Sequence, residues 1–158
     1  MPGEGLSMDA LRAEWEATRR LTRDLLRACT GRDLLFVLHP ASGPVWKQFR
    51  HIGRVQENYL TALETGRVVF DPAAGSYEGG AAGAALDAYF DRLDQRHDAV
   101  LARLAPDCHV DWWGERVPAE GHLLRLLTHE TLHHGQLMLC WRAIGKPFPP
   151  SWAVWGEA

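Results

Sequence analysis

A long apolar helix in the last third of the sequence constrains the fold most. We place it at about residues 118–144, because Pro118 suits a first helical turn and Gly145 followed by Pro147 favours a stop. Leucine recurs throughout this segment, so the helix presents apolar surface in more than one direction. We therefore expect other helices to cover it on several sides.

A strip with several polar side chains follows one face of this helix. Its members, three or four residues apart, are His122, Leu126, His129, His133, Gln136 and Cys140. The pair His129 and His133 is four residues apart, which stacks the imidazoles on one face with Cβ atoms about 5–6 Å apart. Hydrogen-bonded core histidines are the competing interpretation, but an i, i+4 pair beside Glu130 is rarely accidental. We expect the pair to supply two ligands of a metal site.

Length, charge and cysteine content restrict the class of protein. The 158 residues suffice for a single domain, which we expect to cover residues 1–158. The net charge of −3, with acids and bases interspersed, argues against nucleic acid as a partner. No apolar run approaches the roughly 20 residues of a membrane span, so no membrane partner is expected. The three scattered cysteines form no CxxC pair and follow no apolar leader, which predicts reduced thiols and a cytoplasmic protein.

Three further helices are predicted upstream of the long one. The first follows a suitable N-cap and runs over residues 7–29, the second occupies about 43–65, and the third covers 81–104. Each has apolar residues at a spacing of three or four, with charged residues between them. The apolar connector at 34–38 is expected to be a buried loop or a brief strand.

The connections between these helices are long. Residues 66–80 are rich in glycine and long enough to join parallel helices, and 106–117 is expected to be a loop with a short extended piece. Residues 147–155 hold three prolines, so we expect a non-helical aromatic tail packed across the helices. His97 is expected at the surface or rim. Four helices with long connections predict an all-α four-helix bundle, a fold that builds metal sites in its core.

Two segments far apart in the sequence carry histidines on predicted helices. One is residues 49–60, beginning Phe-Arg-His-Ile-Gly-Arg-Val, and the other is 129–137, which reads His-Glu-Thr-Leu-His-His-Gly-Gln-Leu. Together they resemble the DNA-damage-inducible DinB family and its wider DinB/YfiT-like superfamily, over essentially the whole chain. The resemblance implies an up-down-down-up bundle that binds a divalent metal through His51, His129 and His133. His51 lies at the edge of its apolar stripe, so its assignment rests on the resemblance.

Several neighbours of the histidine pair are candidates for other roles. Glu130 and Gln136 could handle protons or position the ligands, and an exposed carboxylate and a helix-packing amide are the alternatives. His134 points about 100° around the helix from the second ligand, and His122 lies two turns, about 10.5 Å, from the first. Neither is expected to share the ion.

The motif also contains the HExxH pattern of zinc proteases, in which the glutamate acts as a general base. The extended form of that motif needs a further histidine at a position where this chain has Leu139. The other common arrangement needs an acid on a later helix, and only Glu157 lies downstream. We therefore rank a protease below the DinB-like interpretation.

Three neutral imidazoles and an open position favour Zn²⁺, with Ni²⁺ as the alternative. Relatives in the superfamily include enzymes that use small cytosolic thiols such as bacillithiol or mycothiol. The resemblance therefore implies an S-transferase that joins a small thiol to an electrophile, with Glu130 and Gln136 as its catalytic candidates. A metal-dependent hydrolase and a non-enzymatic, stress-related metal-binding module are the alternatives. Superfamily bundles often pair through helices, so we also expect a homodimer.

Overall fold

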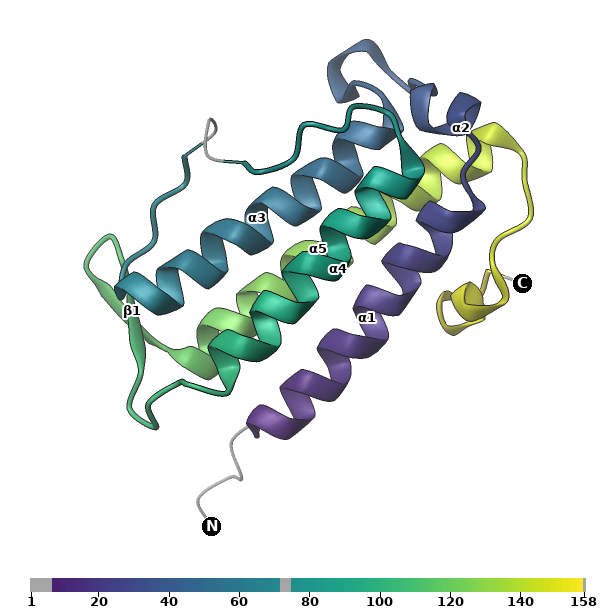
Figure 1. The fold of residues 1–158 in the computed structure, drawn as a ribbon. Coiled ribbons are helices and arrows are strands. Elements are labelled where there is room, and N and C mark those ends of the chain that lie inside the picture. The colour runs from purple at the N-terminus through teal and green to yellow at the C-terminus, as the bar shows by residue number, and fades with distance from the viewer. Residues whose placement is uncertain (1–6, 72–74, 158) are drawn as a thin grey trace.

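The computed structural model describes residues 7–71 and 75–157, most of which are helical (Figure 1). Four long helices dominate, namely α1 (Met8–Ala28), α3 (Val45–Thr65), α4 (Gly83–Leu101) and α5 (Ala119–Ile144). Helix α1 packs against α4 and α5, and α3 packs against the same two helices. The predicted positions of all four helices are confirmed to within a few residues. The main core lies between them.

Local chemistry accounts for several helix ends. The Ser7 side chain accepts a hydrogen bond of 3.1 Å from the backbone N–H of Ala10 and so caps α1, as predicted. Helix α3 ends at Gly66 and α5 ends at Gly145, whose φ angles of 77° and 79° lie in the left-handed region. Glycine adopts this conformation without a steric penalty, so both helices end where the sequence supplies one.

The connector after α1 differs from the prediction. Instead of a loop or strand beginning at residue 34, the short helix α2 covers Gly31–Leu35, and a 3-10 turn, η1, covers Pro40–Ser42. The Thr30 hydroxyl accepts from the Asp33 N–H, and the Asp33 carboxylate accepts from the Thr30 N–H at 2.7 Å. This reciprocal cap starts α2. Lys146, after α5, lies 2.6 Å from the same carboxylate and ties α2 to the end of the long helix.

A small β-hairpin makes the fold not purely α-helical, which corrects the all-α expectation. Strands β1 (His109–Trp112) and β2 (Glu115–Pro118) pair antiparallel, with Val110 opposite Val117, and both valines are buried. The extended piece expected in this loop is therefore one strand of a hairpin. Between the strands Trp113 and Gly114 both have positive φ, as a tight two-residue turn requires.

The first residues of the connection between α3 and α4 are hydrogen-bonded to this hairpin. The backbone N–H of Val68 donates to the Asp111 carbonyl at 2.9 Å, and the Asp111 N–H donates to the Gly66 carbonyl at 2.8 Å. The predicted long connection at 66–80 is confirmed as non-helical wherever it is described, while residues 72–74 lie outside the described part of the chain. The first part of the connection therefore lies alongside β1.

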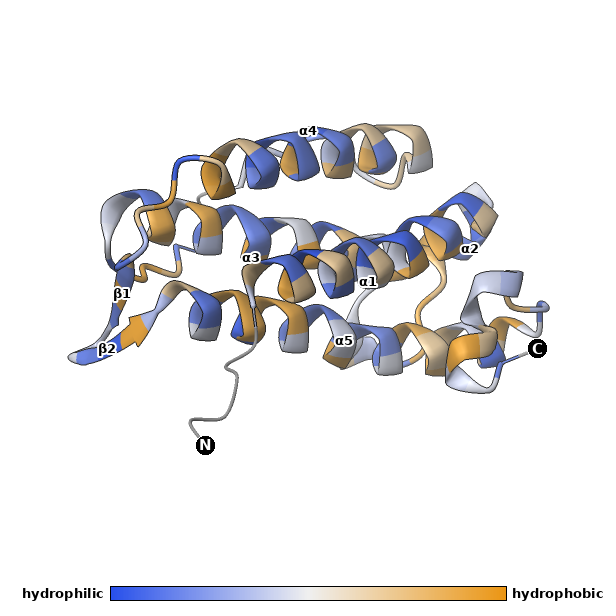
Figure 2. Ribbon diagram, turned by 90° about the horizontal axis from the view of Figure 1, so that it is seen from below, coloured by the Kyte–Doolittle hydropathy of each residue, from blue (hydrophilic) through white to orange (hydrophobic). Residues whose placement is uncertain are grey.

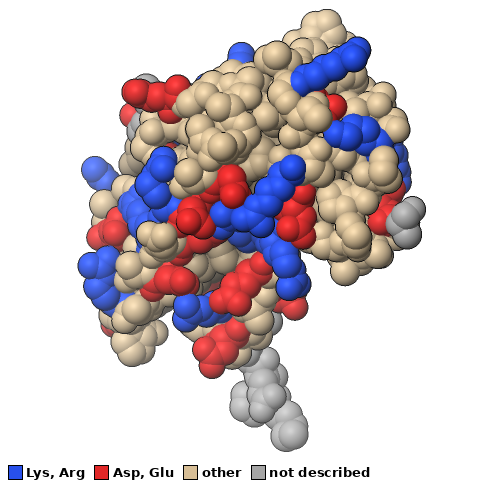
Figure 3. Space-filling view, turned by 45° about the vertical axis from the view of Figure 1, so that its right-hand side comes forward, with Lys and Arg blue, Asp and Glu red and all other residues tan. Residues whose placement is uncertain are grey.

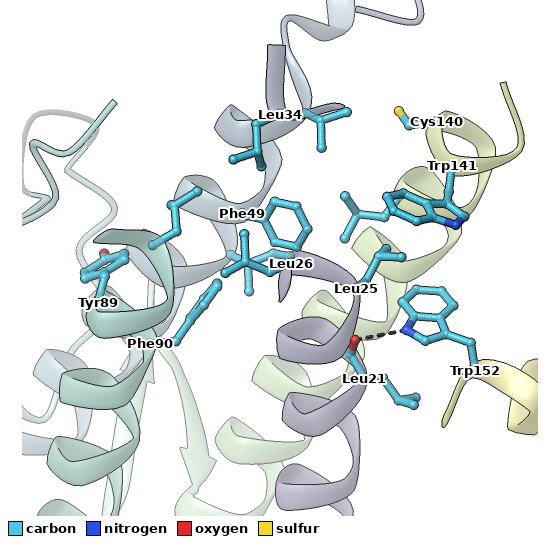
Figure 4. Close-up of a cluster of buried hydrophobic side chains, with 14 of the residues drawn as sticks. Leu21, Leu25, Leu26, Leu34, Phe49, Tyr89, Phe90, Cys140, Trp141 and Trp152 are labelled. Atoms are coloured by element: carbon cyan, nitrogen blue, oxygen red, sulfur yellow. Dashed lines mark hydrogen bonds between the residues drawn. The ribbon is translucent and has the colours of Figure 1, made fainter. Parts of the chain in front are cut away.

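The aromatic tail completes the main core. Trp152 is fully buried, and its indole N–H donates to the Leu21 carbonyl of α1 at 3.0 Å (Figure 4). The tail thus packs on the helices as expected, but the prediction that it is non-helical is wrong, because η2 (Pro150–Trp155) is a 3-10 helix. A proline at the first position of a helix costs no hydrogen bond. Figure 4 also shows Phe49, Phe90 and Trp141 converging on this core.

The surface carries charges of both signs. Apolar and polar residues alternate along each long helix (Figure 2), and acidic and basic side chains are interleaved on the face shown in Figure 3. Ion pairs such as Arg23 with Asp87 at 2.8 Å join α1 to α4. Among the described helices, none is both long enough and apolar enough to cross a membrane.

Candidate metal centre

Three imidazoles converge between α3 and α5. His51 comes from α3, and His129 and His133 lie one turn apart on α5. The Nε2 atom of His129 is 3.2 Å from Nε2 of His51 and 3.1 Å from Nε2 of His133. One nitrogen from each ring lies within 4.8 Å of the other two. Within residues 7–71 and 75–157, no other group of three His, Cys, Asp or Glu side chains is arranged to hold a metal ion.

The spacing of these nitrogens fits a shared ion. Zinc–nitrogen bonds of about 2.0–2.1 Å in tetrahedral geometry place two ligand nitrogens about 3.3–3.4 Å apart. The two measured Nε2 separations, 3.1 and 3.2 Å, are within a few tenths of an ångström of that value. The separations of His129 from the two other rings are therefore close to those of ligands that share an ion.

The protonation states of the three rings also suit a metal. Burial, together with the smaller effect of neighbouring imidazoles, lowers the pKa of His51 and of His129 to about 4, and Arg54 and Arg50 contribute to the lowering at His51. Burial also lowers the pKa of His133, against the opposing effect of a hydrogen bond with Gln136. At neutral pH all three rings are therefore neutral, and a neutral imidazole has the lone pair that a metal ligand needs.

Gln48 determines which nitrogen of His133 faces the cluster. Its Oε1 atom lies 3.0 Å from Nδ1 of His133. An amide oxygen only accepts hydrogen bonds, so Nδ1 carries the proton and the lone pair is on Nε2, toward the other histidines. The sequence analysis missed Gln48. Its position three residues before His51, on the same face of a predicted helix, was the signal that could have found it.

Arg54 has the opposite influence on His51. Its Nη2 atom lies 3.3 Å from Nδ1 of His51. A guanidinium only donates, so this contact favours the tautomer of His51 that carries its proton on Nε2. If His51 held an ion through Nε2, its proton would lie on Nδ1, and the Arg54 guanidinium would then have to turn away from the ring.

Glu130 does not face the three histidines. It is 1% exposed, and its carboxylate contacts α1, with one oxygen 2.5 Å from the Thr22 hydroxyl and the other 3.1 Å from Nη2 of Arg19. Burial raises the pKa of Glu130, while Arg19 and Thr22 act in the opposite direction. The alternative of an exposed carboxylate is therefore wrong. Gln136, the other catalytic candidate, is exposed and lies beside His133.

The other histidines of α5 lie outside the cluster, as predicted. His122 is fully buried, where its Nδ1 accepts from the Trp112 indole N–H and its Nε2–H donates to the Tyr59 carbonyl, both at 2.9 Å. His134 lies on the α1 side, with Nε2 2.7 Å from the Thr22 hydroxyl. Both rings therefore link elements of the fold away from the three converging nitrogens.

His97 on α4 contradicts its predicted surface position. Its side chain is only 3% exposed, and its ring stacks on Trp15 of α1 with the centroids 4.9 Å apart. The aromatic partner lies on a helix far away in the sequence. His97 nevertheless lies between Leu93 and Val100 on the buried stripe of α4, so the spacing could have predicted its burial, though not its partner.

Comparison with known proteins identifies the family. The sequence matches the family model of the DinB superfamily over residues 14–137. The chain belongs to the DinB superfamily. No curated protein matches it.

Solved structures of DinB-like proteins share the fold. A DinB-like protein from Bacillus cereus ATCC 10987 aligns with a TM-score of 0.76 at 16% identity, covering 91% of this chain and 97% of that one. A DinB-like protein from Bacillus subtilis gives 0.71 at 17% identity, with coverages of 88% and 95%. A candidate DinB-family member from Exiguobacterium sibiricum 255-15 gives 0.70 at 24% identity, with coverages of 92% and 97%. At these identities the likeness establishes the fold.

In this DinB-superfamily protein two of the three histidines border a cavity. Its volume is about 400 Å³, and its walls come from α3, from Phe70 and Asp71 of the following connection, and from α5. His51 and His129 both line it. A small molecule in the cavity can therefore approach the nitrogens of the cluster.

Proposed function

We propose that this DinB-superfamily protein binds one divalent metal ion through His51, His129 and His133, with Zn²⁺ preferred and Ni²⁺ as the alternative. The observation that carries the proposal is the convergence of three Nε2 atoms beside a cavity. Three protein ligands with one position left for a small molecule are the arrangement of catalytic zinc sites, whereas structural zinc sites have four protein ligands.

The reaction that we propose is transfer of a small cytosolic thiol to an electrophile. A bound divalent ion supplies positive charge, which favours the thiolate over the thiol. The sulfur forms a bond with an electrophilic carbon, the leaving group departs with the electron pair, and the thiol proton goes to solvent. Within the chain, Gln48 holds His133 in the required tautomer and the cavity holds the electrophile beside the cluster.

Two alternatives have less support. A hydrolase needs a base near the site, but Glu130 is held by Arg19 and Thr22 on the α1 side of the helix. This position also weakens the resemblance to HExxH proteases, whose glutamate acts at the metal. A stress-related metal-binding module without activity uses the same ligands, so the experiments below must separate it from an enzyme.

The proposal includes the architecture and the assembly. The four long helices form an up-down-down-up bundle in one domain, and the protein is a cytoplasmic homodimer. Figure 1 supports this order, because α3 ends beside the hairpin while α4 begins at the opposite end of the molecule. Exposed leucines on α5 support pairing, with Leu132 62% and Leu139 57% exposed.

Elemental analysis of purified protein tests the metal site. We expect about one divalent ion per chain in the wild type and a large loss of metal in His51→Ala and His133→Ala. His39→Ala is the control, because His39 is exposed and lies outside the cluster. Wild-type metal content in both cluster variants would show that the ligand assignment is wrong.

A Co²⁺-substituted sample tests the thiol chemistry. A thiol that reaches the ion should add a sulfur-to-metal charge-transfer band, and His129→Ala should abolish it. If millimolar cysteine and glutathione leave the spectrum unchanged, S-transfer with those thiols is untenable. Conjugation at the same rate by metal-free protein would leave the metal-binding module as the better description.

A further inference from the structure

The cavity beside the histidines has an aromatic wall. Tyr59 of α3 and Phe70 of the following connection both line it, with ring centroids 5.9 Å apart and planes tilted by 55°. Val55, one turn before Tyr59, adds aliphatic surface. Phe70 remains 42% exposed, although it belongs to a residue type that proteins usually bury. Aromatic rings that face an open cavity are typical of small-molecule sites.

This wall is supported from behind. The Trp112 ring lies 5.5 Å from that of Tyr59 and 6.0 Å from that of Phe70, measured between centroids. Its indole N–H donates to His122, and His122 donates to the Tyr59 carbonyl. The hairpin, α5 and α3 are therefore linked directly behind the wall. A wall that is already ordered loses little conformational entropy when a ligand binds.

The charges around the cavity are balanced. One basic residue, Arg54, and one acidic residue, Asp71, line it, together with the amide of Asn58. A ligand with a full charge would therefore meet no net opposite charge, and burial of an unpaired charge is costly. This lining suits an uncharged molecule with one or two hydrogen-bonding groups.

The volume of the cavity also restricts the size of the ligand. The cavity volume of about 400 Å³ is near the lower end of the range of about 300–1,000 Å³ for ligand sites, which suits one or two aromatic rings. We infer that the cavity binds a flat, uncharged aromatic molecule against Tyr59 and Phe70. The additional statement that this molecule is the electrophile of the thiol reaction rests on the proposed function.

Calorimetric titration of metal-free protein with two matched probes tests the inference, because a bound divalent ion would itself attract a carboxylate. The probe 1-naphthol is flat and uncharged, whereas 1-naphthoate has the same rings and a negative charge. We expect 1-naphthol to bind the wild type, 1-naphthoate to bind at least about tenfold more weakly, and Phe70→Ala to weaken 1-naphthol binding about tenfold. Val69→Ala is the control, because Val69 is the exposed neighbour of Phe70 and does not line this cavity.

Equal binding of 1-naphthol to Phe70→Ala and Val69→Ala would overturn the inference, and so would tighter binding of 1-naphthoate. Phe70 is partly exposed, so its replacement should leave the fold intact, which circular dichroism can verify. The same titration on His133→Ala separates this inference from the proposed function. Binding of 1-naphthol there, without any thiol band in the Co²⁺ sample, would retain the aromatic site and remove the transferase. A thiol band in the Co²⁺ sample without 1-naphthol binding would retain the transferase and remove the aromatic site.

Discussion

Gln48 acts on the proposed metal centre through its hydrogen bond to His133. In Gln48→Leu the Nδ1 proton of His133 loses its acceptor, so we expect metal affinity to fall about 10–100-fold. Gln48→Glu should retain the affinity, because a carboxylate is also an acceptor. Competition with a chromogenic chelator measures the affinity. Lys47→Leu, an exposed neighbouring position, is the control, and equal affinities of the two leucine variants would contradict the role of Gln48.

His122 makes stability depend on pH. Burial lowers its pKa to about 4, and the Trp112 N–H already occupies the nitrogen that would accept a proton. The folded pKa lies below the ordinary value of 6.5, so the unfolded chain binds the proton first as pH falls. The contribution of His122 is therefore complete above pH 6.5 and is lost toward pH 4, about 3 kcal/mol in all.

Urea unfolding of metal-free protein at several pH values checks this expectation. Between pH 6.5 and 4 the slope of unfolding free energy against pH should be smaller in His122→Gln than in the wild type, by up to about 1.4 kcal/mol per pH unit. Metal-free protein is used so that ion release does not contribute to the slope. An unchanged slope would mean that His122 binds its proton equally well in the folded and unfolded states.

At the scale of helices, two glycines in helix interiors should respond oppositely to alanine. A Cβ on Gly53 of α3 would lie 2.2 Å from the Tyr89 ring of α4, whereas a Cβ on Gly135 of α5 meets nothing within 4 Å. Gly135→Ala should therefore stabilise the protein by up to about 1 kcal/mol through helix propensity. Gly53→Ala should destabilise it by about 1–3 kcal/mol, because Tyr89 is fully buried and has little room to move. Urea unfolding measures both effects. Midpoints that shift in the same direction in the two variants would contradict the predicted opposite effects.

The long helices could be predicted from the sequence because their apolar spacing and end residues act locally. The closeness of His129 and His133 on α5 could be predicted for the same reason, since four residues separate them. Helix α2 was also encoded locally, in the reciprocal cap between Thr30 and Asp33, but that signal was overlooked. The contacts of Glu130 with Arg19 and of His97 with Trp15 could not be predicted from local spacing. Both partners lie on α1, far away in the sequence.

At the scale of the whole molecule, exposed leucines on α5 predict assembly. We expect light scattering at micromolar concentration to give the mass of a dimer, and Leu132→Glu with Leu139→Glu to give a monomer. Leu35→Glu is the control, since Leu35 is 60% exposed on α2 rather than on α5. A monomeric wild type would contradict the dimer, and dissociation by Leu35→Glu alone would place the interface elsewhere.

The hydrogen bond from Trp152 to Leu21 has a consequence for synthesis of the chain on the ribosome. The two residues are separated by 131 positions, and at roughly 5–20 residues per second the tryptophan is added roughly 7–26 s after the leucine. During that interval Leu25 and Leu26, buried in the finished protein, lack a side chain that completes their hydrophobic cluster. A slow stretch of codons late in the message would lengthen this exposure and give chaperones more time to bind the nascent helix.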